Sequence, residues 1–184
     1  MASAPPNSHL VWIDLEMTGL DPNKDLILEI ATLITDNNLG LIAKGPELVI
    51  HQSNTVLEAM NDWCKKQHGK TGLTEAVRAS TIPLEEAEIQ TLEFIQTYCK
   101  KESSPLCGNT VYQDRAFLRK YMPKVDQFLH YRIVDTSSVK ELVKRWYPKD
   151  PLAEFKKSDT HRALADIQES VNELKQYRDA FFKS

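Results

Sequence analysis

Residues 10–16 read LVWIDLE, an apolar run that ends in two acids. A continuous apolar run of this length is typical of a strand buried on both faces of a sheet. Because side chains alternate along a strand, Asp14 and Glu16 point from the same face. The two carboxylates repel each other, and a hard divalent cation between them relieves the repulsion. On its own, however, such a pair is more often structural, so a metal site at the strand end needs further ligands.

The remaining elements follow an order that predicts the fold class. Strand-like runs come next at residues 26–34 and 41–50, with a turn signal between them at 37–40. Helical spacing then alternates with short strands: helices at 54–67, 83–100, 113–121 and 137–146, a last helix whose apolar stripe runs from 164 to 181, and strands at 106–107 and 133–134. Three residues before the last helix are candidate caps, namely Ser158, Asp159 and Thr160. This order predicts an α/β fold whose mixed central sheet is flanked by helices.

Composition limits the classes of function. The chain has 184 residues, with 23 Lys and Arg against 26 Asp and Glu, a net charge of -3 that argues against a long, sequence-blind nucleic-acid groove. The length predicts one domain, and we expect a flexible tail over residues 1–9 and a single domain over 10–184. The apolar runs are far shorter than the about 20 residues of a membrane helix, so no membrane partner is expected.

Cysteine usage and the N-terminal residues bear on location. The three cysteines include no C-x-x-C pair, which suits a reducing compartment and gives no disulfide framework. Residues 1–9 have neither the apolar region of a signal peptide nor the arginines of a transit peptide. We therefore expect an intracellular protein with packed, free cysteines.

Two further acids and a histidine lie where strands end or helices begin. Asp114 follows the strand at 106–107, and the carboxyl ends of strands hold the sites of open α/β sheets. Asp166 comes one residue before the apolar stripe position Ile167, in the second turn of the expected last helix. His161 precedes Asp166 by five residues, about 140° around a helix, so it is free to accept a proton rather than bind metal. Each of the three also has an ordinary structural reading, as a first-turn acid, a surface acid and a first-turn histidine.

Together, Asp14, Glu16, Asp114, His161 and Asp166 resemble the three-motif layout of the DEDDh exonucleases. The surrounding sequence is similar to that of the oligoribonuclease family in the segments WIDLEMTGL at 12–20, CGN at 107–109, QD at 113–114, HYR at 130–132 and TH at 160–161. The likeness extends over nearly all of residues 10–182 and favours a eukaryotic member of the family. It implies an RNase H-like exonuclease fold and a single 3′-5′ exonuclease domain over residues 10–184.

The resemblance also implies the chemistry. The family hydrolyses phosphodiester bonds with two divalent cations, Mg²⁺ or Mn²⁺. Asp14 would contact both ions, Glu16 and Asp166 would complete the site of the ion that activates water, and Asp114 would help to hold the second ion. His161 would be the general base. The expected activity is 3′-to-5′ degradation of dinucleotides and slightly longer RNA to nucleoside 5′-monophosphates.

Residues that bind the bases are implied in the same way. Leu20 and Trp63 would pack on or between the bases, with His68 beside them. Stacking on an aromatic ring reads no particular base and therefore suits RNA of mixed sequence. Without the resemblance, Trp63 has the ordinary reading of a residue in a helix core.

A second group would set the length of the substrate. Tyr131 and Arg132 would close the site of the neighbouring subunit, which makes a homodimer the expected active unit. Thr110, Arg132 and Ser137 would receive the 5′ phosphate. Thr110 has a methyl group more than the serine that many relatives have there. Members of the family are cytosolic or mitochondrial, so either compartment is expected.

Two other functions stay open at this stage. The first is a DEDDh exonuclease that acts on longer RNA or on DNA 3′ ends, which dependence of the rate on substrate length would distinguish. The second is a non-catalytic nucleotide-binding module, for which the sequence shows no inactivating change among the four acids and the histidine.

Overall fold

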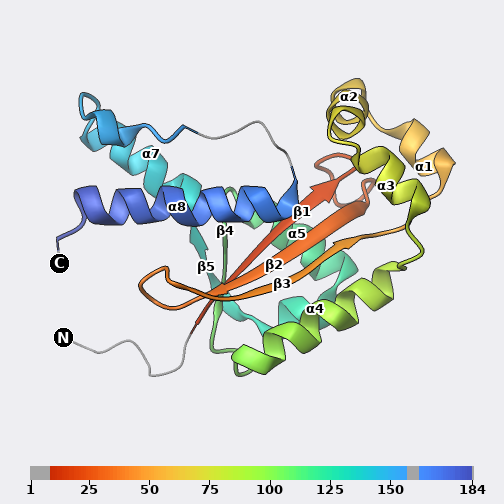
Figure 1. The fold of residues 1–184 in the computed structure, drawn as a ribbon, viewed down its shortest axis with the longest axis horizontal. Coiled ribbons are helices and arrows are strands. Elements are labelled where there is room, and N and C mark those ends of the chain that lie inside the picture. Colours follow the sequence, from red (N-terminus) through yellow and green to blue (C-terminus); the bar gives the residue numbers. More distant parts are fainter. Residues whose placement is uncertain (1–8, 157–161, 184) are drawn as a thin grey trace.

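A computed structural model describes residues 9–156 and 162–183 of the chain (Figure 1). Its strands are β1 (Leu10–Met17), β2 (Ile27–Thr35), β3 (Leu41–Val49), β4 (Pro105–Gly108) and β5 (His130–Asp135). Its helices are α1 (Asn54–Ala59), α2 (Asp62–Lys70), α3 (Leu73–Ala79), α4 (Leu84–Tyr98), α5 (Tyr112–Tyr121), α6 (Pro123–Phe128), α7 (Thr136–Trp146) and α8 (Ala163–Phe181), with a short 3-10 turn at Pro151–Ala153.

The strands form one mixed sheet in the order β3-β2-β1-β4-β5. β1 pairs antiparallel with β2, and β2 pairs antiparallel with β3, so the first three strands form a meander, with the predicted turn at 37–40 between β2 and β3. β4 and β5 are added in parallel on the other side of β1, each reached through helices. The predicted α/β fold with a mixed sheet is confirmed.

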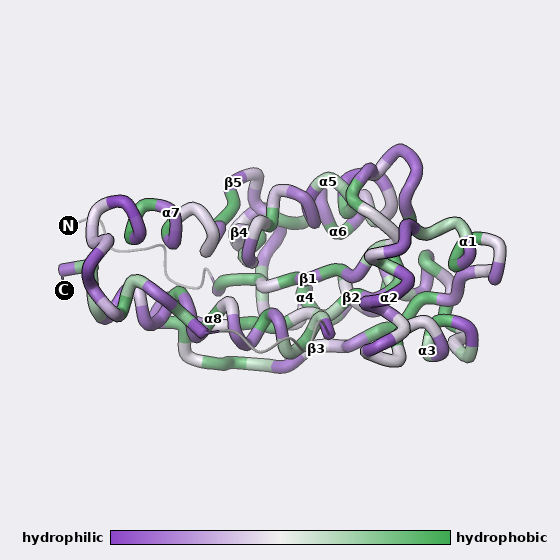
Figure 2. The backbone as a smooth tube through the Cα atoms, turned by 90° about the horizontal axis from the view of Figure 1, so that it is seen from above, coloured by the Kyte–Doolittle hydropathy of each residue, from purple (hydrophilic) through white to green (hydrophobic). Residues whose placement is uncertain are grey.

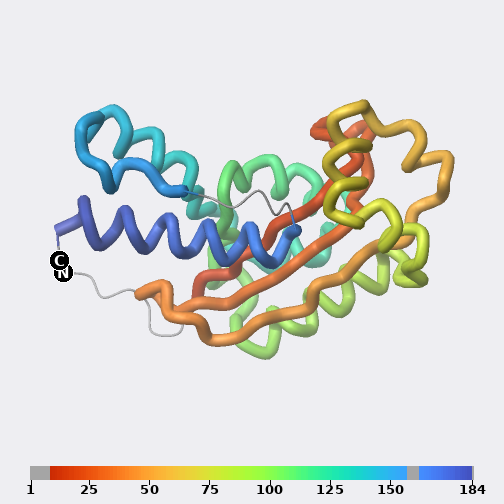
Figure 3. The backbone as a smooth tube through the Cα atoms, turned by 45° about the horizontal axis from the view of Figure 1, so that its top comes forward, coloured from red at the N-terminus to blue at the C-terminus, as the bar shows by residue number. Residues whose placement is uncertain are grey.

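β1 lies at the centre of the sheet, and its alternating side chains divide between two cores. Val11, Ile13 and Leu15 pack into the cluster that includes residues of α4 and α5. Trp12 faces the other side and packs with Ala163 and other residues of α8. Figure 3 shows α8 crossing the strands, and Figure 2 shows hydrophobic colour along β1 in the middle of the molecule. Even-numbered residues of β1 therefore face α8.

Two helical predictions need correction. The helix expected over residues 54–67 is two helices, because Met60 has an extended backbone and the Asn61 side chain caps α2 by accepting the Cys64 N–H. Helices α3 and α6 were not predicted, and both are short.

The start of α8 also differs from the prediction. The helix begins at Ala163 with Arg162 at its N-cap, so Asp166 lies in the first turn rather than the second. The predicted caps Ser158, Asp159 and Thr160 lie outside the described residues, as do residues 1–8 of the tail expected over residues 1–9.

Other expectations are confirmed. The turn at 37–40 is closed by Asp36, whose side chain accepts the N–H groups of Asn38 and Gly40. All three cysteines are buried and free of disulfides. Among the described residues, no helix is long and apolar enough to cross a membrane.

Candidate active site

Three of the predicted acids meet where β1 ends beneath the first turn of α8. Asp14 and Glu16 share the face of β1 on which Trp12 packs against Ala163 and its helix. Asp166 approaches from that helix, and one carboxylate oxygen of each acid lies within 4.8 Å of the others. All three side chains are partly buried. We call Asp14, Glu16 and Asp166 the acid cluster.

Asp114 joins the site from α5 by an unusual contact with β1. Parallel pairing of β1 with β4 is recorded at Val11 and Trp12, and β4 itself ends at Gly108. Beyond that point the Leu15 N–H donates to Asp114 Oδ1 at 3.0 Å, so a side chain takes the place of a strand carbonyl. Because Leu15 stands between Asp14 and Glu16, the bond fixes Asp114 against the acid cluster.

The electrostatics of these acids favour a cation. Burial raises the pKa of Glu16 to about 8, with Asp166, Glu29 and Asp114 adding repulsion and Arg162 opposing them. Burial also raises the pKa of Asp114 to about 7, although the Leu15 N–H favours its charged form. Carboxylates that ionise with difficulty in a partly dry site gain from a nearby positive charge. The donors are all oxygens, which fits a hard cation such as Mg²⁺ or Mn²⁺.

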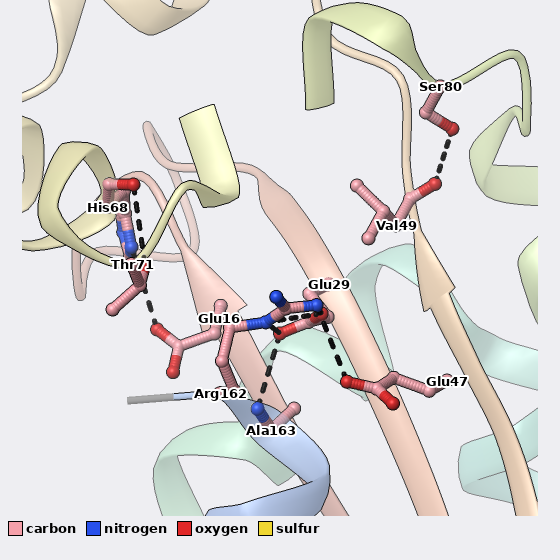
Figure 4. A network of polar contacts seen from close by, with 9 residues as sticks. All are labelled: Glu16, Glu29, Glu47, Val49, His68, Thr71, Ser80, Arg162 and Ala163. Carbon is pink, nitrogen blue, oxygen red and sulfur yellow. Dashed lines mark hydrogen bonds and ion pairs between the residues drawn. The ribbon is translucent and has the colours of Figure 1, made fainter. Parts of the chain in front are cut away.

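His161, the predicted general base, lies outside the described residues. The residue after it was not predicted as part of the site. Arg162 forms a forked contact with Glu29 of β2, and Glu29 also accepts the Ala163 N–H, as Figure 4 shows. The sequence held one signal, since Glu29 is the lone acid in the apolar run 26–34.

A pocket of about 380 Å³ opens beside the acid cluster. It is lined by Glu16, Leu20, Trp63 and His68, so the three predicted base-binding residues are brought together next to one of the acids. Leu20 is 71% exposed and Trp63 is 64% exposed, which excludes a core role for the tryptophan. Exposed apolar side chains beside a polar site are suited to stacking on bases.

The segment that presents Leu20 is held from α5. Gln113 donates from its side-chain amide to the Leu20 carbonyl. The Tyr121 hydroxyl contacts the carbonyls of Pro22 at 3.0 Å and Asp25 at 2.8 Å. These bonds order the backbone at Leu20 and after it while its side chain stays exposed, which reduces the entropy lost when a base packs on it.

His68 differs from its two neighbours because it is buried. Its Nε2 lies 2.9 Å from the Met17 carbonyl oxygen, and its Nδ1 lies 3.8 Å from Glu16 Oε2. The ring therefore braces the end of β1 and faces one acid of the cluster. Its predicted contact with substrate stays a prediction.

Two of the predicted phosphate-binding residues meet at Asp135. The Asp135 carboxylate accepts the N–H groups of Thr110 and Ser137, each at 2.9 Å, and the Ser137 hydroxyl at 2.6 Å. Thr110 has a left-handed backbone with φ of 60°, a conformation that costs a β-branched residue energy. The loop after β4 and the start of α7 are thus held together by one side chain.

Tyr131 and Arg132 stand on the edge strand β5. Tyr131 is 73% exposed, and the Arg132 guanidinium carbon lies 5.4 Å from the centre of its ring. The preceding strand end is fixed by the buried Arg115, which donates to the His130 carbonyl and pairs with Asp126 at 2.8 Å. The pair faces outward, as a contribution to another subunit requires.

Another buried carboxylate, that of Glu173, lies further along α8, and its role was not predicted. Glu173 accepts hydrogen bonds from Asn109 at 3.1 Å and from the Tyr177 hydroxyl at 2.9 Å. Lys140 of α7 forms an ion pair with it at 3.0 Å. We call these four residues the Glu173 network. It ties the loop that contains Thr110 to both helices.

Comparison with known proteins agrees with this geometry. The chain matches the family model described as "Exonuclease" over residues 11–174. Solved structures of exonuclease I from Escherichia coli and Methylocaldum szegediense superpose with TM-scores of 0.73 and 0.70, at 14% and 17% sequence identity. The match covers 95% and 96% of this chain but 41% of each exonuclease I chain. The class is therefore exonuclease, and the expected RNase H-like exonuclease fold is confirmed.

Relatives of higher identity define the family within that class. The oligoribonuclease of Haemophilus ducreyi is 53% identical over 177 residues, which is 96% of each chain. The oligoribonuclease of Marinobacter nauticus is 55% identical over 174 residues, or 95% of this chain and 96% of that protein. The chain belongs to the oligoribonuclease family. The predicted family is confirmed, while the eukaryotic origin stays a prediction.

Proposed function

We propose that this chain degrades very short RNA oligonucleotides from the 3′ end to nucleoside 5′-monophosphates. The observation that carries the proposal is the acid cluster beside the apolar pocket of Leu20 and Trp63, in a chain of the oligoribonuclease family. A 3′-terminal nucleotide stacked in that pocket would have its scissile phosphate next to the carboxylates.

The acids would hold two divalent cations, Mg²⁺ or Mn²⁺. Asp14 would serve both, Glu16 and Asp166 would complete one site, and Asp114 would support the other. Cations held there would lower the pKa of the attacking water and would stabilise the leaving 3′ oxygen. His161 would accept the water proton. The raised pKa of Glu16 supports this assignment: burial is its main cause, repulsion from neighbouring acids adds to it, and a nearby cation would offset both.

Substrate length would be set at the other end of the RNA. Thr110 and Ser137 would receive the 5′ phosphate, and the partner's Tyr131 and Arg132 would close over it in a homodimer. The exposure of Tyr131 and the contact of Arg132 with its ring support this role. A capped pocket excludes longer chains sterically, so no extended basic track is needed in a protein of net charge -3.

The test is hydrolysis of 5′-labelled RNA of two, five and twenty nucleotides, with Mg²⁺, with Mn²⁺ and with EDTA, beside an Asp14→Asn variant. We expect metal-dependent release of mononucleotides, fastest on the dinucleotide and lost in the variant. Equal rates on the twenty-nucleotide RNA would replace the proposal by a general DEDDh exonuclease of longer RNA or DNA ends. Binding without cleavage would favour the nucleotide-binding module.

The dimer and the location have tests of their own. Sedimentation of the full chain should give twice the monomer mass, and mixing an Asp14→Asn protein with an Arg132→Ala protein should restore part of the activity through heterodimers. Buried free cysteines support an intracellular location. Imaging of the tagged native protein distinguishes cytoplasm from mitochondrion. We also propose residues 10–184 as one exonuclease domain, which limited proteolysis tests.

A further inference from the structure

Glu29 is a buried acid that pairs across the sheet with a residue of the acid cluster. It lies on β2 directly opposite Glu16 of β1 in the antiparallel register. Its side chain is fully buried, and a buried carboxylate is costly unless its oxygens are bonded. Both oxygens are used: Arg162 reaches Oε1 from Nη2 at 2.6 Å and Oε2 from Nε at 3.2 Å, and the Ala163 N–H reaches Oε2 at 3.2 Å.

These contacts fall at the start of α8. The helix has Arg162 at its N-cap and no cap from that residue's own side chain. Glu29 of β2 supplies the acceptor for the Ala163 N–H at the helix start. Its negative charge also interacts favourably with the positive end of the helix dipole. The first turn of α8 is therefore anchored to β2 (Figure 4).

The anchor leads directly to the acid cluster. The Asp166 N–H donates to the Arg162 carbonyl at 3.0 Å, the bond that closes the first turn of the helix. Fixing Arg162 and Ala163 against Glu29 thus fixes the turn that brings Asp166 toward Asp14 and Glu16. Carboxylates must be held to within about half an ångström for a metal site to keep its geometry.

Charge supports a positioning role rather than a ligand role for Glu29. Its oxygens are already engaged by the Arg162 fork and a backbone N–H, so the carboxylate is directed toward the helix start. Arg162 also has Glu47 of β3 within reach, at 3.4 Å from its Nη2. The guanidinium therefore sits between two acids, only one of which contacts the helix.

We infer that Glu29 and Arg162 form a positioning pair that sets where Asp166 enters the metal site. Neither residue touches metal or substrate in this role. The inference rests on the proposed function, since it takes the acid cluster to be the metal site. Partners behind metal ligands commonly change metal affinity by about 10- to 100-fold when removed.

The test is a titration of the full-length chain with Mn²⁺, followed by electron paramagnetic resonance of the free ion. In Arg162→Gln we expect binding weaker by about 10-fold. Simple electrostatics predicts the opposite, because removal of a positive charge near the carboxylates should strengthen binding of a cation. Glu29→Gln should weaken binding by a similar factor.

Glu47→Gln is the matched control. It removes an acid that contacts the same guanidinium but not the helix, and it should bind Mn²⁺ as the unmodified protein does. Arg162→Lys keeps the charge and loses the fork, so its affinity should fall between those of the unmodified protein and Arg162→Gln. It also supplies the test if Arg162→Gln does not fold.

Several results would overturn the inference. These are stronger or unchanged Mn²⁺ binding in Arg162→Gln, or a loss in Glu47→Gln as large as that in Glu29→Gln. If the metal-free variants melt at lower temperatures but bind Mn²⁺ with unchanged affinity, Glu29 and Arg162 stabilise the fold and do not position Asp166. Mn²⁺ binding without RNA cleavage in the unmodified protein would refute the proposed function and leave the positioning role intact, whereas no Mn²⁺ binding would refute both.

Discussion

Two sites with carboxylates in contact with α8 differ in the groups that surround each carboxylate. In the Glu173 network, a fully buried acid has an ammonium group, a hydroxyl and an amide bonded to it. In the acid cluster, three carboxylates face one another, and the pKa of Glu16 is raised to about 8 despite the Arg162 guanidinium. One group pairs an acid with a cation and two hydrogen-bond donors, and the other brings three acids together.

The difference separates structure from function. A carboxylate that only stabilises a fold is satisfied by partners within the chain, as Glu173 is. Carboxylates left to repel each other at a strand end cost folding energy, and they are retained where a ligand removes the cost. On this basis, changes in the acid cluster should act on activity, and changes in the Glu173 network should act on stability.

Asp14→Asn should have the largest effect. It removes the acid proposed to serve both cations, and metal catalysis contributes several kcal/mol, so the rate on a dinucleotide should fall at least about 1,000-fold. The melting temperature of the metal-free protein should stay the same or rise, because one repelling charge is lost. Hydrolysis rates with Mg²⁺ and calorimetric melting curves measure both, and a variant that is inactive because it is unfolded would contradict the contrast.

Glu173→Gln should show the reverse pattern. The amide keeps the volume but leaves Lys140 without its charged partner, so the free energy of unfolding should fall by about 1–3 kcal/mol. Urea denaturation at a pH near 7 measures it. The rate per folded molecule on a dinucleotide should stay within about threefold, and a loss as large as that of Asp14→Asn would place Glu173 in the catalytic machinery instead.

The acid cluster could be predicted from the sequence, whereas the Glu173 network could not. The run LVWIDLE gave the central strand, and its period of two put Asp14 and Glu16 on one face, as the structure has them. The mixed sheet followed from the alternation of helices and strands, whereas the order of the strands within it was not predicted. The other acids of the site were assigned from the family resemblance. No local pattern links Asp114 to residue 15, because the two are 99 positions apart in the sequence.

The parts not predicted depend on contacts between distant residues. Glu29 was unexpected because an acid inside an apolar strand has no partner within its own segment, and its partner Arg162 lies 133 residues away. The helix expected over residues 54–67 is interrupted at Asn61, which caps α2. Hydrophobic periodicity did not show the interruption, because a cap depends on the local turn. Short helices such as α6 offer too few turns for a period to appear.

Trp63→Ala tests the pocket beside the acid cluster. Stacking of one base on an aromatic ring is worth about 1–3 kcal/mol, so KM for a dinucleotide should rise by about 10-fold or more. The value of kcat should change much less, because Trp63 is 64% exposed and is not one of the acids. Steady-state kinetics on dinucleotides of different sequence provide the measurement, with Trp146→Ala on α7 as a matched exposed tryptophan, 67% accessible. Equal effects of the two substitutions would remove the pocket from the proposal.

The smallest expected effect is a pH dependence of the metal-free protein. Burial raises the pKa of Glu16 to about 8 in the fold, against 4.5 for an exposed glutamate, so between these pH values the folded chain binds more protons than the unfolded chain. Stability from this group should therefore fall as pH rises from about 5 to 8, with a slope of at most about 1.4 kcal/mol per pH unit. Urea denaturation of the metal-free protein across this range should show the slope, and Glu16→Gln should reduce it to the part that Asp114, with its pKa raised to about 7, contributes. Saturating Mg²⁺ should also reduce the slope, because the cation stabilises the ionised carboxylate. The control substitution Glu173→Gln should leave the slope unchanged.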